Sequence, residues 1–344
     1  MDLRRPRRTL RFLRLACAAV TLILGTAAAW ERFENIELRR VGTLFETSLE
    51  TLREKPVGKT FAVVGDTGSG GAAFQTLFSQ IVRERPDFLV VLGDINYRSI
   101  GHYTIFRDSL PADLPVFAVP SNHDRKIDPE LEVFEALIGP ARATFTRGGA
   151  RFFLLDTSRE TIPEDDRAWL LEALRVAGPG PKFVLTHIPP YDPTHPGGPP
   201  RTRHSLWDPE SAAWLVETAA REGVTAIFTG HWHGFYPTEF SGVPCIVTGG
   251  GGYEPDSGQI PHFLLVPLDG DLSRMRKIDM GSASMAQTLA WATDFEFEDF
   301  SDRFAPFAAA GTAIAWFLLT ILLRRARFRP ALVGQPAGLR SLSS

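Results

Sequence analysis

The central part of this 344-residue chain is predicted to fold as an α/β sheet protein. Short apolar runs rich in Val, Ile and Phe alternate, without internal repeats, with segments whose apolar residues recur at helical spacing. Several of these runs end in polar groups, and α/β sheets bind their ligands at such strand ends. We therefore expect one sheet-based domain over residues 57–270, with a ligand site at a sheet edge.

Each expected element follows from its local residue pattern. The expected strands, apolar and rich in β-branched and aromatic residues, cover residues 60–65, 88–93, 116–120, 151–156, 182–186, 226–229, 244–248 and 262–266. The expected helices, with apolar residues at helical spacing, cover residues 72–85, 129–138, 163–177 and 209–222. Residues 188–200 are rich in proline and glycine and are expected to form a loop.

Charge is distributed unevenly along the chain. The formal net charge is −3, but six arginines fall within residues 1–14 and five follow residue 323. Residues 15–323 are left with 26 basic and 39 acidic side chains, a formal charge of −13. Because so acidic a domain repels a phosphate backbone, no nucleic-acid binding is expected. The only cysteines are Cys17, in the first apolar segment, and Cys245, so the domain can form no internal disulfide.

Two apolar segments flank the domain. Residues 1–30 combine a basic head with an apolar run, which fits either a secretory signal peptide with a cleavage site at its alanines or an uncleaved N-terminal anchor. Residues 304–323 carry no charge over about the length that a bilayer core requires, and arginines follow at once. We expect a transmembrane helix there; the alternative is a buried core helix.

The arginines at both ends of the chain predict on which side of the membrane the domain lies. Basic flanks stay in the cytoplasm, so the domain between them is expected on the outer side, periplasmic or extracellular. Residues 271–303, acidic and aromatic toward their end, are expected to form a juxtamembrane stalk, and residues 324–344 a basic cytoplasmic tail.

Polar groups with metal-binding side chains follow five of the expected strands. They are Gly65-Asp66-Thr67-Gly68, Gly93-Asp94-Ile95-Asn96-Tyr97, Ser121-Asn122-His123-Asp124, Thr186-His187 and Gly230-His231-Trp232-His233. Because each group starts at a strand end, their side chains are expected to meet at one sheet edge. Oxygen and nitrogen donors in this mixture suit iron, zinc or manganese, and the two cysteines exclude a thiolate site.

Each group taken alone has a simpler structural explanation. A Gly-Asp pair after a strand is usually a turn, and Asn-His-Asp is commonly a helix cap or a loop. The pair His231 and His233 is more specific, because alternate residues of a strand put both rings on one face. The occurrence of all five groups in order, each at a strand end, favours a metal site.

The ordered set Asp, Gly-Asp-x-x-Tyr, Asn-His-(Asp/Glu), His and Gly-His-x-His resembles the calcineurin-like metallophosphoesterase superfamily, over roughly residues 60–266. Within it, the pattern is most similar to the purple acid phosphatases. Most superfamily members carry Asp-x-His in the first group, whereas this chain has Gly68 at the third position, as purple acid phosphatases do. The resemblance implies a four-layer α/β/β/α sandwich with a two-metal site at one sheet edge.

The resemblance also implies which residues hold the first metal ion. Asp66, Tyr97 and His233 would be its ligands, with Tyr97 replacing the histidine that is missing at Gly68. The ion is expected to be Fe(III), because phenolate is a hard anionic donor. The structural alternative for Tyr97 is a buried aromatic residue after a strand.

The second ion would be divalent: Zn(II), Mn(II) or Fe(II). By the same resemblance, Asn122, His187 and His231 would hold it, and Asp94 would bridge the two ions. Two such ions, about 3.5–4 Å apart, bind phosphoryl oxygens and lower the pKa of a coordinated water.

Histidines next to the ligands are the candidates for catalysis. His123 resembles the family histidine that contacts phosphate or protonates the leaving oxygen; alternatively, it only hydrogen-bonds a carboxylate such as Asp94. His195, in the proline-rich loop, is a further substrate-side candidate, and His204 competes with it; either could be a solvated loop residue. Residues 249–252 are expected to form a tight loop at the rim of the site, and Asp156 a structural cap.

These features predict a metal-dependent phosphatase that hydrolyses phosphate monoesters outside the cytoplasm. One alternative is a phosphodiesterase that acts on a nucleotide, a lipid head group or a cell-wall intermediate. Another is a non-catalytic membrane protein that keeps the site as a metal-held scaffold. The presence of all seven candidate ligands and of His123 favours an enzyme.

Overall fold

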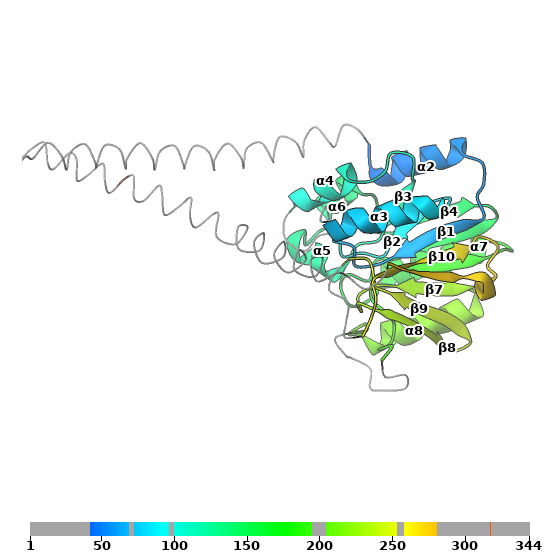
Figure 1. Ribbon diagram of the computed structural model, residues 1–344. Helices are drawn as coiled ribbons and strands as arrows, with labels where there is room; N and C mark the ends of the chain where they lie inside the picture. Colours follow the sequence, from blue (N-terminus) through cyan, green and yellow to red (C-terminus); the bar gives the residue numbers. More distant parts are fainter. Residues whose placement is uncertain are drawn as a thin grey trace, which may run out of the picture. The chain divides into compact units, whose positions relative to one another are not determined.

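The computed structural model describes residues 42–68, 72–95, 100–194, 204–252, 258–280 and Phe317. Apart from Phe317, these residues lie in one compact unit, Phe33–Asp299. Two β-sheets form the centre of this unit, with helices on their outer sides (Figure 1).

The first sheet contains five strands in the order β11-β10-β1-β2-β3. Its strands β1 (Thr60–Val64), β2 (Leu89–Val91) and β3 (Val116–Ala118) run parallel. Strand β10 (His262–Pro267) pairs antiparallel with β1, and β11 (Arg276–Asp279) pairs antiparallel with β10. The three parallel strands therefore end at the same edge of the sheet.

The second sheet has the strand order β4-β5-β6-β7-β9-β8. Four strands run parallel: β5 (Ala150–Leu154), β6 (Lys182–Leu185), β7 (Ala226–Thr229) and β9 (Val243–Thr248). The edge strands are β4 (Ala143–Arg147) and β8 (Phe235–Phe240), and both are antiparallel to their neighbours. Pro237 lies in β8. Proline has no N–H to donate to a neighbouring strand, and on an edge strand that donor can be spared.

Phenylalanine rings fill the space between the sheets. Along β1, Phe61 and Val63 join this inner core, while Ala62 and Val64 join the core under the helices, as the alternation of a strand requires. The ring of Phe61 packs edge-on against Phe152, with ring centres 5.0 Å apart. Because both faces of the first sheet are covered at β1, β2 and β3, these strands are apolar along most of their length rather than alternating.

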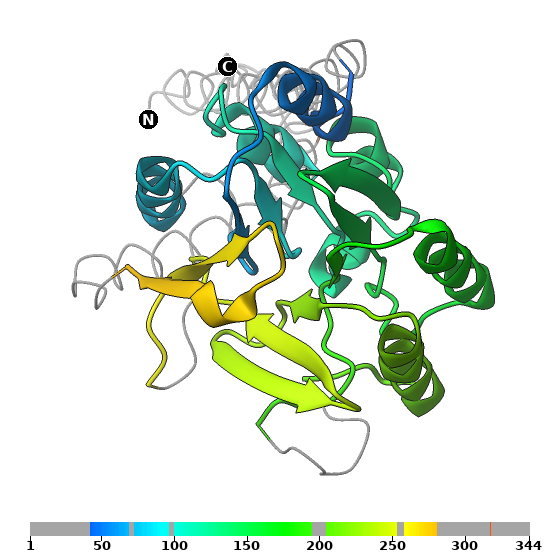
Figure 2. The same ribbon diagram turned by 90° about the vertical axis from the view of Figure 1, so that its right-hand side faces the viewer.

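Helices cover the outer face of each sheet. Helices α3 (Ala72–Glu84), α4 (Gly101–Asp108) and α6 (Glu132–Leu137) pack on the first sheet. Helices α7 (Glu164–Val176) and α8 (Pro209–Arg221) pack on the second, and Figure 2 shows both on that side. The layer order is therefore α/β/β/α, the sandwich that the resemblance implied.

The structure contains elements that the sequence analysis did not predict. They are α2 (Leu44–Glu54), α4, α5 (Asn122–Ile127), β4, β8, β11 and a 3₁₀ turn, η1 (Leu272–Arg274). Helix α2 begins with a capping box between Thr43 and Glu46, a signal that the sequence carries. Strand β11 lies in the range expected to be a stalk, so the sheet continues past residue 270.

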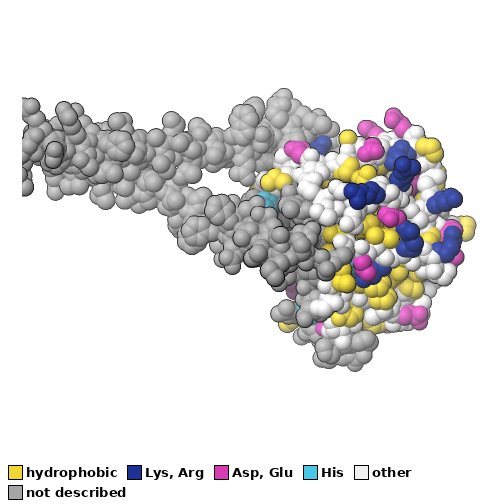
Figure 3. All heavy atoms as spheres, in the orientation of Figure 1, with side chains coloured by type: hydrophobic (Ala, Val, Ile, Leu, Met, Phe, Trp, Pro, Cys, Tyr) yellow, Lys and Arg dark blue, Asp and Glu magenta, His cyan; other side chains and the backbone are white. Residues whose placement is uncertain are grey.

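The predicted membrane segments fall outside the part of the chain that is described. These are residues 1–30, 304–323 and 324–344, except for Phe317. Among the described helices, none combines the length and the apolar character that a membrane span needs. On the face of the unit in Figure 3, basic and acidic side chains of the described residues are interspersed, with no continuous basic patch.

Candidate metal centre

Two aspartates follow neighbouring strands of the first sheet. Asp66 comes two residues after β1, and Asp94 comes three residues after β2. Both have positive φ angles, 59° and 55°, which non-glycine residues rarely adopt. Two backbone hydrogen bonds join the turns, one from Asp66 N to Gly93 O (3.2 Å) and one from Gly68 N to Asp94 O (2.9 Å). Such strained backbone is typical of functional sites.

The carboxylate of Asp66 is fully buried. Its Oδ2 accepts a hydrogen bond from the backbone N–H of His231 at 2.9 Å. Its Oδ1 is buried without a hydrogen bond to any described residue and lies 3.5 Å from Nε2 of His233. Burial raises the pKa of Asp66, His233 and His187 oppose this effect, and the negative charge of Asp94 adds to it. A cation beside Oδ1 would supply the compensation that water no longer provides.

Glycines allow this burial. A Cβ on Gly230 or on Gly249 would lie 2.6 Å from Oδ2 of Asp66. The backbone therefore packs directly on the carboxylate from two sides. Gly249, the first residue of the loop 249–252 expected to close the rim of the site, thus lies against the predicted ligand itself.

His187 follows β6 of the second sheet and reaches the end of β2 in the first. Its Nδ1 lies 2.7 Å from the carbonyl oxygen of Leu92 and must carry the proton, since a carbonyl can only accept. Nε2 is then the ring nitrogen that could bind a metal ion. This atom lies 3.0 Å from Oδ1 of Asn122 and 3.4 Å from Oδ1 of Asp94. Three potential ligand atoms thus lie close together in a buried space, and the bond to Leu92 orients the ring as such bonds do for metal-binding histidines.

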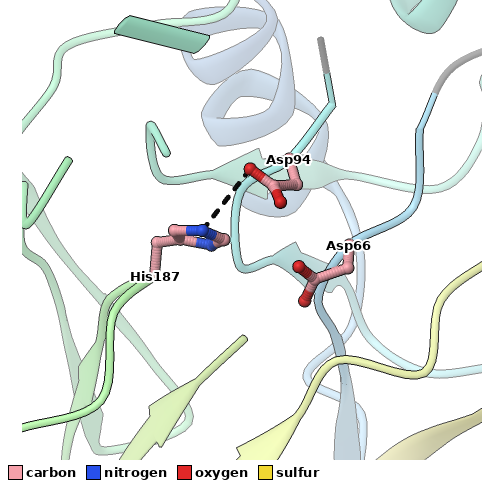
Figure 4. A group of neighbouring side chains, drawn as sticks. All are labelled: Asp66, Asp94 and His187. Atoms are coloured by element: carbon pink, nitrogen blue, oxygen red, sulfur yellow. Dashed lines mark ion pairs between the residues drawn. The ribbon is translucent and has the colours of Figure 1, made fainter. Parts of the chain in front are cut away.

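Asp66, Asp94 and His187 form a group that could hold a metal ion. Each offers one ligand atom, and these atoms all lie within 4.8 Å of one another. Figure 4 shows the three side chains directed toward a common space, with the Asp94–His187 contact drawn as a dashed line. Carboxylate and imidazole donors in this mixture suit iron, zinc or manganese.

Asn122 and His123 open helix α5, which follows β3. Ser121 caps this helix: its hydroxyl accepts from the N–H of Asp124 at 3.1 Å, and the Asp124 carboxylate accepts from the N–H of Ser121. Asn122 is buried, and His123 is partly exposed. Burial lowers the pKa of His123, while the charge of Asp94 opposes this effect. His123 is therefore within electrostatic reach of the predicted bridging ligand.

His231 and His233 were expected to lie on one face of a strand, but they reach the site from turns that follow β7. Strand β7 ends at Thr229, so the two histidines do not lie on one strand face. Tight turns follow instead, with hydrogen bonds from Trp232 N to Gly230 O (2.8 Å) and from Gly234 N to Trp232 O (2.7 Å). His231 has a φ of 68°, and its Nδ1 lies 3.2 Å from Nε2 of His187.

Two of the predicted site residues, Tyr97 and His195, lie outside the described residues, in the ranges 96–99 and 195–203. The competing candidate, His204, is described and partly exposed, just before α8. The remaining predicted ligands come from five strand ends of two sheets and meet in one place, but their binding of metal stays a prediction.

The residues that support the ligands were not predicted from the sequence. The carbonyl of Leu92 carries no signal in the sequence, because every residue has one. Arg125 and Ser158 both contact Asp156, which was expected to be a cap, yet nothing in their local pattern indicated the contact.

The fold and this group define an α/β/β/α protein with a candidate metal centre where the edges of its two sheets meet. Residues 59–235, more than half of the chain, match the family of calcineurin-like phosphoesterases. The chain therefore belongs to the calcineurin-like phosphoesterase family, whose members bind two metal ions.

Solved structures give more distant similarity. GAP50, the anchor in the inner membrane complex of Plasmodium, is 15% identical, with a TM-score of 0.47 over 69% of this chain and 95% of its own. PhoD is 13% identical, with a TM-score of 0.45 over 72% of this chain and 78% of its own. TT1561 of Thermus thermophilus is 15% identical, with a TM-score of 0.45 over 66% of this chain and 100% of its own. No curated protein matches the sequence.

Proposed function

We propose that this protein hydrolyses phosphate monoesters at a two-metal site of the purple acid phosphatase type. Membership of the phosphoesterase family supports hydrolysis of a phosphate ester. The metal-ion pair, its Fe(III)–M(II) composition and the preference for monoesters are the parts that we propose.

The distances between the candidate ligands carry this proposal. Nε2 of His187 lies 3.0 Å from Asn122 and 3.2 Å from His231, and these are the three residues expected to share the divalent ion. Nε2 of His233 lies 3.5 Å from Oδ1 of Asp66, and these two are expected to share the ferric ion. These contacts support the two ligand sets that the resemblance implies, and the group of Asp66, Asp94 and His187 lies where the two sets meet.

The first metal-binding group supports the purple acid phosphatase branch. Gly68 has a φ of 60°, and no atom of a described residue lies within 4 Å of the place where its Cβ would be. A histidine there would be strained, so a ligand from elsewhere would have to take its place. Tyr97, at the position where this branch carries its tyrosine, would supply that ligand as phenolate.

The side chains have distinct roles in the proposed reaction. When bound, the two ions would supply positive charge to the phosphoryl group and acidify a coordinated water. Leu92 fixes the tautomer of His187 and so directs Nε2 into the site. His123, beside Asn122, would contact the phosphate or give a proton to the leaving oxygen. A phosphate group next to His123 would raise its pKa and so favour the protonated form.

A paired rate assay on the full-length chain tests the proposal. The purified protein is loaded with iron and either zinc or manganese, and an aryl phosphate monoester is compared with the matching diester. Asp94→Asn serves as the blank, because it removes the predicted bridging charge and keeps the size of the side chain. Metal content is measured in both proteins.

We expect two ions per chain and a clear preference for the monoester. A preference for the diester would keep the metal site but reject the monoesterase assignment. Two bound ions without turnover of either ester would instead favour a scaffold role.

We also propose that residues 304–323 anchor the protein in a membrane with the catalytic domain on the outer side. The support is the charge-free length of this segment and the arginines that follow it. Protease added to sealed cells should cleave the domain, and the fragment left in the membrane should retain the basic tail. A domain that stays intact until the cells are lysed would place it in the cytoplasm.

A further inference from the structure

Two of the predicted ligands of the divalent ion come from different sheets. Asn122 follows β3 in the first sheet, and His187 follows β6 in the second. The 3.0 Å between Oδ1 of Asn122 and Nε2 of His187 therefore depends on how the two sheet edges are held together. A metal site of this kind needs a rigid connection between the edges beside it.

Arg125 and Asp156 make such a connection. Arg125 lies on α5, three residues after Asn122, and Asp156 lies two residues after β5 of the second sheet. Nη2 of Arg125 donates to Oδ2 of Asp156 at 2.7 Å, and its Nε donates to Oγ of Ser158 at 2.7 Å. The two charged side chains are only 14% and 10% exposed. Burial reduces competition from water, so these charge-assisted bonds hold α5 against the end of β5.

Both carboxylate oxygens of Asp156 accept hydrogen bonds. Its Oδ1 accepts two further hydrogen bonds, from the backbone N–H (2.8 Å) and the hydroxyl (2.5 Å) of Ser158. The donors to its two oxygens are Arg125 and Ser158, which also bind each other. Asp156 is a support for the ligands rather than one of them.

The residues beside Asp156 hold His187 from both sides. Thr186 donates its hydroxyl proton to the carbonyl of Leu155 at 2.9 Å, so Thr157 must donate in the 2.8 Å contact between the two threonine hydroxyls. The hydroxyl of Thr157 also accepts from the N–H of Ile188 at 2.9 Å. Both neighbours of His187 in the chain are therefore fixed to the segment that binds Arg125.

We propose that Arg125, Asp156 and Ser158, the inter-sheet bridge, are positioning residues that set the spacing of Asn122 and His187 for the divalent ion. This inference rests on the proposed two-metal function. Loosening the bridge would let α5 and the segment after β6 move apart. The divalent ion would then bind more weakly, while the ion held by Asp66 and His233 would be affected much less.

Titration of Mn²⁺ into the metal-free full-length chain tests the bridge. Asp156→Asn keeps the shape of the side chain but removes its charge, and Ser158→Ala removes two bonds with less effect on folding. In each variant, we expect one of the two Mn²⁺ dissociation constants to rise about 10- to 100-fold, the usual effect of losing a residue that supports a metal ligand. Excess Mn²⁺ should restore hydrolysis of the aryl phosphate monoester by both variants, because their catalytic groups remain.

The chain supplies a matched control. Arg147, at the end of β4, binds Asp87, which precedes β2, so this pair also joins the two sheets. It does so at the opposite ends of the parallel strands from the metal ligands. Asp87→Asn should lower the thermal unfolding temperature and leave both Mn²⁺ dissociation constants within about twofold of the wild-type values.

The outcomes separate the two proposals. Wild-type affinity in both Asp156→Asn and Ser158→Ala would overturn the positioning role and leave the proposed function intact. Equal weakening by Asp87→Asn would also overturn it, because the effect would then reflect general stability. A wild-type chain that binds neither Mn²⁺ nor, in the same titration, Zn²⁺ or Fe²⁺ would overturn both proposals together.

Discussion

The guanidinium of Arg147 binds both carboxylate oxygens of Asp87, with Nε 2.6 Å from Oδ2 and Nη2 2.9 Å from Oδ1. The same group donates to the carbonyl oxygens of Leu52 (2.5 Å), Lys55 (3.0 Å) and Pro56 (2.7 Å). One buried side chain thus connects both sheets with the end of α2. Because these groups are largely buried, removing Arg147 would leave several of them without a hydrogen-bond partner.

Replacing Arg147 with Met should destabilise the protein strongly. It leaves Asp87 charged, buried and unpaired, which costs about 3–5 kcal/mol in the free energy of unfolding. Urea denaturation measures this loss. Arg276→Met, which removes an exposed ion pair with Glu84, is the control and should cost less than about 1 kcal/mol. Similar losses in both variants would contradict the structural role of Arg147.

Gly249→Ala should weaken metal binding without unfolding the chain. The added Cβ would lie 2.1 Å from the carbonyl oxygen of Trp232 and 2.6 Å from Oδ2 of Asp66, so the carboxylate or the loop must shift. We expect at least a tenfold loss of affinity for the ion at Asp66, measured by calorimetry.

Gly223→Ala provides the comparison for Gly249. Gly223 has a φ of 66°, and no atom of a described residue lies within 4 Å of its Cβ position. The change should cost about 1–2 kcal/mol of stability through backbone strain and leave metal affinity unchanged. If both glycine variants lost metal equally, strain rather than contact with Asp66 would be the cause.

His123→Ala should lose turnover while keeping both ions. Loss of a general acid lowers kcat by about 10²- to 10⁴-fold. Metal analysis and initial rates on the same sample separate the two effects. His102→Ala, on α4 and outside the five metal-binding groups, should keep its rate. Full turnover in His123→Ala would mean that this histidine only supports a carboxylate.

His262 should make the fold sensitive to acid. Burial lowers its pKa to about 4, and the charge of Lys277 acts in the same direction. The carbonyl of Ile260, 2.8 Å from Nδ1, and the charge of Asp279 oppose the shift. Its Nε2 is buried without a hydrogen bond to any described residue. The folded state therefore favours the neutral ring.

The sign of this pH effect follows from linkage. The contribution of His262 is complete above pH 6.5, the usual pKa of histidine, and is lost as the pH falls toward 4. At pH 5 the loss amounts to about 2 kcal/mol. The free energy of unfolding is measured by urea denaturation at pH 7 and pH 5, in the wild type and in His262→Asn. Between these pH values the wild type should lose about 2 kcal/mol more than the variant. Equal losses in the two proteins would mean that other groups control stability in acid.

The sequence predicted the strands and the ligand groups for a physical reason. Strands such as β1 and β2 are covered on both faces, so their apolar runs stand out, and a polar residue such as Asp66 marks where the chain leaves the core. The elements that the sequence did not predict lack this contrast between an apolar run and a polar end. Strand β11 is a short polar edge strand, and α5 has only six residues and owes its start to the cap at Ser121.

By itself, the sequence determined the family and which side chains could bind metal, because those depend on residue types in a fixed order. Only the tertiary structure decided how they are held. His231 turns toward Asp66 through a left-handed backbone rather than a strand face, and His187 receives its tautomer from Leu92. The bridge from Arg125 to Asp156 spans 31 residues and two sheets. No local pattern encodes such contacts, because they exist only once the sheets have packed.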